Sequence, residues 1–267
     1  MNGLYSKDYF RITEEEKNEE KRLKQENTQI TSGGFEIVWN YYFDKPKAIR
    51  HYESLFPNNY LDIADLRECD KLEKQCDEFE KLINHEEITE LSIKSFIQDN
   101  RYYFIPASLF RHYDFGHHDA YLFKEFSLGT SYRADYLLVG KSSCGYSFVL
   151  VEFENPYKNI TVKSGEYGDT IRKGISQIND WDSFLQSEYS AFSSELKKYT
   201  NKSSLPFEFT NYDATRFHFV VIAGRRTDFS EKSYRLRRNT EMKDRIKILH
   251  YDNLLDDARY MIGQKTY

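Results

Sequence analysis

Residues 133–156 read RADYLLVGKSSCGYSFVLVEFENP, and this stretch decides the fold. Two runs rich in apolar, β-branched and aromatic residues flank a turn that contains Gly and Ser, which is the pattern of a β-hairpin. We therefore predict adjacent antiparallel strands over 132–139 and 146–154. If the turn is centred between Ser143 and Cys144, Asp135 and Glu152 stand directly opposite each other on the two strands.

Three carboxylates gather at the end of this hairpin. Strand side chains alternate, so Glu152 and Glu154 share a face with Asp135 while Phe153 points the other way. Carboxylates this close repel one another, and a divalent cation between them removes the repulsion. Oxygen ligands suit Mg²⁺ or Mn²⁺. The alternative is a solvated strand end at which the acids pair with a nearby base such as Arg133.

Composition indicates a folded, globular protein of 267 residues, because 20 Phe and 22 Tyr supply ample core. No run of about 18 apolar residues occurs, and the N-terminus lacks the apolar segment of a signal peptide. We therefore expect a soluble, cytoplasmic protein with no membrane partner. Cys69, Cys76 and Cys144 are odd in number and lack the spacing of a metal motif, which argues against a disulfide framework or a structural zinc site.

The formal net charge of −5 argues by itself against a nucleic-acid partner. The distribution of charge points the other way, because basic residues are concentrated between 225 and 238, and clustered arginines attract phosphate. A solvated loop is the alternative explanation. The residues we expect to bind nucleic acid are Arg225, Arg226, Arg235, Arg237 and Arg238.

The residues before the hairpin are predicted to form mainly helices, and they contain few candidate catalytic residues. Residues 13–27 are highly charged and either helical or disordered, and 35–43 read as a strand. The apolar spacing predicts an amphipathic helix over 61–83 and another from Thr89. Glu90 lies in the first turn of the second helix, where an acid complements the helix dipole; a catalytic role is the alternative.

Residues after the hairpin complete an α/β layered domain. A helix follows Asp169, which can cap it. Lys173, Gln177 and Trp181 recur along this helix at every fourth position and share one face. That face either contacts a substrate or is simply a polar outer surface with Trp181 half buried. Strands are predicted over 217–223 and 245–250, with a closing helix over 253–262.

The order of these motifs resembles the PD-(D/E)XK nuclease core, a restriction-endonuclease-like mixed sheet flanked by helices. More closely, it resembles the Shedu anti-phage defence proteins. The resemblance covers residues 75–267 and leaves 1–74 as an N-terminal appendage. The motifs that carry it are LINHEEITELSIKSFIQDN, FKEFSLG, RADYLL, VLVEFENP, GISQINDW, VVIAGRR and KILHYDNLLDDA.

By this resemblance the chain is a metal-dependent DNA endonuclease, a hydrolase that nicks or cuts phosphodiester bonds in antiviral defence. Asp135 and Glu152 are then metal ligands together with the carbonyl of Phe153. Gln177 is the glutamine of the supporting helix, and Glu90 is a helix acid near the site. The resemblance also implies a homo-oligomer.

One residue departs from the family's pattern. The third position of the strand triplet is usually Lys and is Glu154 here. Three readings stay open. Glu154 acts as a further metal ligand or base; Lys173 supplies the missing charge from the helix; or catalysis is lost, and the chain is an inactive nucleic-acid-binding or sensor module that keeps the nuclease fold.

Overall fold

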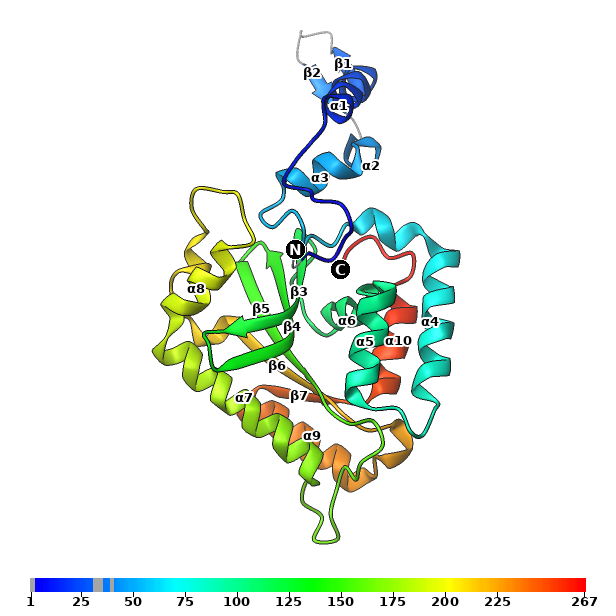
Figure 1. Cartoon of the computed structure of the whole chain (residues 1–267), viewed down its shortest axis with the longest axis vertical. Helices are drawn as coiled ribbons and strands as arrows, with labels where there is room; N and C mark the ends of the chain where they lie inside the picture. The colour runs from blue at the N-terminus through cyan, green and yellow to red at the C-terminus, as the bar shows by residue number, and fades with distance from the viewer. Residues whose placement is uncertain (1–2, 31–35, 39–40) are drawn as a thin grey trace.

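The computed structural model describes residues 3–30, 36–38 and 41–267. Its centre is a five-stranded mixed sheet in the order β3-β4-β5-β6-β7 (Figure 1). The first three strands are antiparallel, and β5, β6 and β7 are parallel. The predicted α/β class is confirmed. The strands are β3 Asp119–Leu128, β4 Tyr132–Ser142, β5 Gly145–Phe153, β6 Phe217–Ile222 and β7 Ile246–Leu249.

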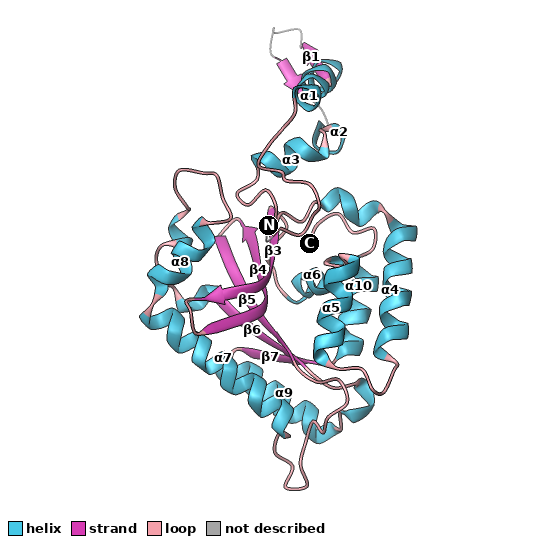
Figure 2. Cartoon of the chain, in the orientation of Figure 1, coloured by secondary structure: helices cyan, strands magenta, loops and turns pink. Residues whose placement is uncertain are grey.

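Helices cover both faces of the sheet, as Figure 2 shows. One layer contains α4 Cys69–Ile83, α5 Glu90–Asn100, α6 Phe104–Ala107 and α10 Tyr251–Met261. The other contains α7 Asp169–Ser187, α8 Tyr189–Lys197 and α9 Glu231–Asp244. Parallel strands require crossover connections. The chain passes through α7 and α8 between β5 and β6, and through α9 between β6 and β7.

The first segment of the chain extends from one end of the sheet (Figure 1). It contains α1 Glu14–Glu26, β1 Thr28–Ile30, β2 Glu36–Val38, α2 Tyr41–Asp44 and α3 Lys47–Glu53. Thr13 begins α1 with a capping box, so residues 13–27 are helical. The strand predicted over 35–43 is found at 36–38 and is wrong at 41–43, which belong to the helix α2. Residues 35, 39 and 40 lie outside the described part.

Two predicted helix starts are wrong. The helix predicted over 61–83 is divided into a 3₁₀ turn, Ile63–Arg67, and α4, because the Asp62 side chain accepts the Ala64 N–H and fixes a separate turn there. Asp169 does not cap its helix: Gly168 is the N-cap and Asp169 is the first helical residue.

Two expectations about the outer surface are also corrected. Trp181 is completely buried against the sheet rather than half buried. Most of the Arg-rich segment is not a loop, since residues 231–244 form α9.

The expected domain boundary at 74/75 falls inside α4. Leu4, Leu61 and Leu66 pack in the same core as Ile93 and Ile97 of α5. The division into two domains stays a prediction. Within the described ranges, no helix has both the length and the apolar character needed to cross a bilayer.

Candidate active site

The hairpin has the predicted register. The last backbone pair at the open end of the hairpin joins Tyr136 to Val151, and Asp135 and Glu152 are the next residues on the two strands. Phe153 packs on Tyr136 and Tyr251 in the core between the sheet and α4, α5 and α10. Phe153 therefore points away from the face that carries Glu152 and Glu154, as predicted.

Asp135 is held by two donors. Its Oδ2 accepts the backbone N–H of Phe153 at 2.8 Å, and its Oδ1 lies 2.7 Å from Nζ of Lys94 on α5. The same ammonium lies 2.7 Å from Oε1 of Glu90. Burial raises the pKa of Asp135, and Lys94 offsets part of this effect. Lys94 is itself partly desolvated, but the Asp135 and Glu90 carboxylates outweigh this and raise its pKa.

Glu152 is buried with only partial compensation, because burial and the neighbouring acids raise its pKa while the charge of Lys94 lowers it. Its side chain is 4 % exposed and forms no hydrogen bond or ion pair with any described residue. Burial, followed by the charges of Asp135 and Glu154, raises the pKa of Glu152 to about 9. An unpaired buried carboxylate is costly. A further cation bound beside Glu152 would therefore favour its charged form.

A lysine from the opposite helical layer contacts Glu154. Nζ of Lys173, on α7, lies 2.9 Å from Oε1 and 3.1 Å from Oε2 of Glu154. Only the contact to Oε2 has hydrogen-bond geometry, and Oε1 is buried with no hydrogen-bond donor in the described part of the chain. Burial raises the pKa of Glu154, while Lys173 lowers it. Gly174 permits this approach, since a Cβ there would lie 2.8 Å from Val221 on β6.

The three carboxylates are suitable ligands for a hard divalent cation, but their present arrangement is not that of a metal site. Asp135 and Glu154 both raise the pKa of Glu152, and carboxylate oxygens are the ligands that Mg²⁺ and Mn²⁺ prefer. Yet no three acidic, His or Cys side chains in the described ranges stand in metal-binding geometry. Two lysine ammonium groups, from Lys94 and Lys173, occupy positions beside the acids instead.

A groove beside the acids is formed by α7 and the start of β4. Its volume is about 560 Å³, and Arg133, Lys173, Gln177 and Trp181 line it. Lys173 joins the groove to Glu154. The predicted common face of Lys173, Gln177 and Trp181 is confirmed, and the groove lies along it.

The predicted arginine cluster divides into two groups. Arg225 is a structural residue: its guanidinium pairs with Asp252 through Nε at 3.1 Å and Nη2 at 2.8 Å, and it also donates to Tyr157 and Asn84. Arg226 pairs with Asp256. The remaining members lie on α9 and form no ion pair within the described ranges; they are Arg235, Arg237 and Arg238.

Lys94 is the site residue that the sequence did not predict. It lies 41 positions before Asp135, so only the packing of α5 beside the sheet brings the two together. One signal was present, because Glu90 and Lys94 are four residues apart on a helix and such pairs interact.

The fold and this site define a mixed α/β protein with an acidic cluster at the ends of two adjacent strands, flanked by a lysine from each helical layer. A family model described as "Shedu protein SduA, C-terminal" matches residues 87–255. The chain therefore belongs to the Shedu family, which associates it with anti-phage defence. The match contains all three strand acids and both lysines. No curated protein matches the chain.

Proposed function

We propose that this chain is a Mg²⁺- or Mn²⁺-dependent DNA endonuclease with a PD-(D/E)XK-like centre. The observation that carries the proposal is Glu152, a carboxyl group that is 4 % exposed, has no partner among the described residues and stands opposite Asp135. A site of this kind is stable as a carboxylate only with a cation nearby. Family membership supports a role in defence, where cleavage of invading DNA is a direct means of protection.

Asp135 and Glu152 would hold the ion, with the carbonyl of Phe153 as a further ligand and Glu154 as an outer ligand or base. A bound divalent ion lowers the pKa of a water and polarises the phosphodiester. An ion bound at Oδ1 of Asp135 would displace the ammonium of Lys94 from that oxygen. Glu90 stays within reach of Lys94 and keeps the displaced ammonium beside the site.

The side chains of the groove would bind and orient the substrate. The ammonium groups of Lys94 and Lys173 offset the charge of the acids and provide donors for phosphate oxygens. Gln177, one turn further along α7 than Lys173, would position the backbone or the attacking water. The arginines of α9 would add sequence-independent affinity. The strand triplet lacks the family's usual Lys. Lys94 and Lys173, on two different helices, would supply its positive charge.

Plasmid nicking tests this proposal. We expect cleavage with Mg²⁺ or Mn²⁺, none with EDTA, and a loss of at least about 100-fold for Asp135→Asn or Glu152→Gln. Glu125→Gln is the matched control, because Glu125 is an exposed acid on the neighbouring strand β3. Equal cleavage by wild type and Asp135→Asn would remove the assignment.

A specific observation favours a second candidate. Lys94 and Lys173 already compensate two of the acids without any metal, which suits a catalytically inactive DNA-binding or sensor module. Calorimetry separates the two functions. DNA affinity that persists with no measurable Mn²⁺ binding would favour the module, whereas Mn²⁺ binding that depends on Glu152 would favour the nuclease.

A further inference from the structure

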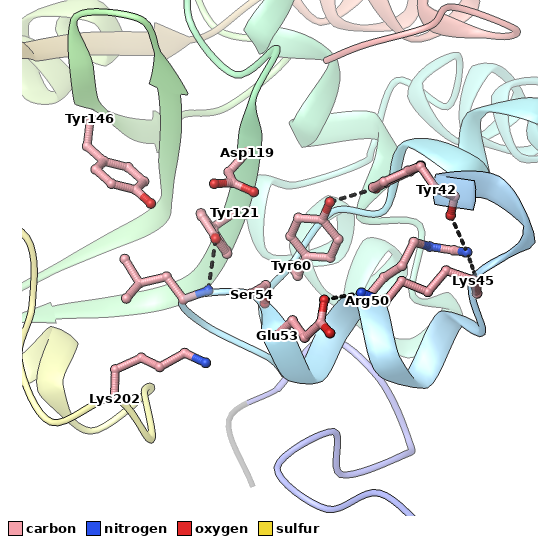
Figure 3. A pocket seen from close by; sticks show the side chains of 11 residues that line it. Tyr42, Lys45, Arg50, Glu53, Ser54, Tyr60, Asp119, Tyr121, Tyr146 and Lys202 are labelled. Carbon is pink, nitrogen blue, oxygen red and sulfur yellow. Dashed lines mark hydrogen bonds and ion pairs between the residues drawn. The ribbon is translucent and has the colours of Figure 1, made fainter. Parts of the chain in front are cut away.

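A second polar pocket lies at the opposite end of the hairpin from the acids. Asp119, which begins β3, is paired with Lys141 near the far end of β4 from Asp135. The pocket has a volume of about 380 Å³, within the range of small-molecule sites. It is formed jointly by α2 and α3, by β3 and β5, and by Lys202 from the loop after α8. Figure 3 shows these side chains.

Several polar groups of the pocket are already satisfied by the protein. Arg50 is bonded to Asp62 through Nε at 2.9 Å and Nη2 at 2.7 Å. Lys45 forms an ion pair with Glu53. These groups shape the wall but have little capacity left for a ligand.

Two charged groups of the pocket have no such partner. Neither the Asp119 carboxylate nor Nζ of Lys202 forms a hydrogen bond or ion pair with any residue that the structure describes. Burial raises the pKa of Asp119, and the charges of Lys141 and His118 only partly offset this effect. The pocket thus offers two groups to a ligand. The Asp119 carboxylate accepts hydrogen bonds, and the Lys202 ammonium is a cation.

Tyrosine rings form the rest of the lining. In Figure 3 the Asp119 carboxylate lies between Tyr146 and Tyr60. Tyr60 donates to, or accepts from, Tyr42 at 2.8 Å, and the Tyr121 hydroxyl accepts the Leu55 N–H at 3.0 Å. These hydroxyls are largely satisfied. Tyr60, Tyr121 and Tyr146 are buried, so among the tyrosines of this lining it is Tyr42, 38 % exposed, whose ring presents aromatic surface. Aromatic surface of this kind stacks on a flat, unsaturated ring system.

We propose that this pocket binds a guanine mononucleotide. A carboxylate accepts two hydrogen bonds from a group with adjacent N–H donors, and guanine presents such a pair on its N1 and N2 edge. The exposed ring of Tyr42 takes the base, and Lys202 takes the phosphate. Because Tyr42 belongs to the N-terminal segment and Asp119 to the sheet, the ligand joins these two parts of the chain.

The site goes beyond the proposed nuclease function and is tested without it. The full chain in EDTA is titrated calorimetrically with GMP, AMP and guanosine. We expect GMP to bind about tenfold or more tightly than AMP, and Asp119→Asn to weaken GMP binding about tenfold or more. Lys202→Met should weaken GMP but leave guanosine unchanged, and Lys163→Met, an exposed lysine outside the pocket, should change neither.

Thermal melts of each variant establish that it is folded. Absence of GMP binding to the wild type would overturn the proposal. Equal affinity for GMP and AMP, or unaltered GMP binding by folded Asp119→Asn, would overturn it as well. Plasmid nicking has no bearing on these results, so the two proposals fail separately.

Discussion

Nζ of Lys94 lies 2.7 Å from Oδ1 of Asp135, joining a helix on one face of the sheet to the first acid of the hairpin. Lys173 makes the equivalent contact to Glu154 from the other face. Asp135 and Glu154 thus each contact an ammonium group, one from each helical layer, whereas Glu152 contacts no cation in the described part of the chain. A divalent cation at the proposed site would compete with Lys94 for the Asp135 carboxylate, and such competition would have measurable consequences.

Replacing Lys94 with Met should tighten metal binding while slowing catalysis. The Asp135 oxygen becomes available to the metal, so we expect Mn²⁺ affinity to rise several-fold, about 1 kcal/mol. Loss of a donor for the phosphate should lower the nicking rate about tenfold or more. Calorimetry and single-turnover nicking measure the two effects. Lys74→Met, on the exposed surface of α4, is the control, and a Lys94→Met protein with wild-type affinity and rate would contradict the competition.

Exchanging the charges of Glu154 and Lys173 tests their contact. Glu154→Lys alone places two ammonium groups together at a buried position and should lower the free energy of unfolding by about 3 kcal/mol. The double variant Glu154→Lys/Lys173→Glu restores an ion pair and should recover most of that loss. Urea denaturation measures both. A double variant no more stable than the single one would show that the contact contributes little.

Arg225 and the arginines of α9 should behave differently. Arg225→Ala removes the ion pair with Asp252, which keeps the Arg226 backbone N–H as a donor, and should cost about 3 kcal/mol in the free energy of unfolding. Arg235→Gln/Arg238→Gln changes only exposed side chains, so its stability should stay within about 0.5 kcal/mol of wild type. In DNA binding the double variant should reduce the slope of log affinity against log salt by about 2. An unchanged slope would remove α9 from the DNA surface.

His51 should make the protein less stable in acid. It is completely buried and stacks on Tyr9, and burial lowers its pKa to about 4. The folded state keeps His51 neutral, whereas the unfolded chain binds a proton below its usual pKa of about 6.5. Stability attributable to His51 is therefore full above pH 6.5 and declines towards pH 4, by about 3 kcal/mol in total.

Urea denaturation of wild type and His51→Phe between pH 4 and pH 7.5 measures this contribution as a difference. The wild-type curve should fall more steeply than that of the variant below pH 6.5. Parallel curves would mean that His51 does not titrate on unfolding in this range.

The sequence predicted those features that depend on local pattern. Strand alternation and the turn at Ser143 and Cys144 were sufficient for the hairpin register, and hence for the opposition of Asp135 and Glu152. Helix spacing was sufficient for the common face of Lys173 and Gln177.

Features that depend on tertiary packing were missed. The α9 helix has a highly charged sequence that hides its few buried positions, such as Ser233 and Thr240. Arg225 acts through its contact with Asp252, and Lys94 through its contact with Asp135. The two residues of each pair are far apart in the sequence, so no local pattern predicts the contact. The burial of Glu152 likewise follows from β6 and α7 packing beside it.

A crystal soaked in Mn²⁺ tests the central claim most directly. We predict an anomalous peak about 2.0–2.5 Å from carboxylate oxygens of both Asp135 and Glu152, with Lys94 moved away from Oδ1 of Asp135. An empty map at this position, with Lys94 still 2.7 Å from Asp135 at saturating Mn²⁺, would contradict the account.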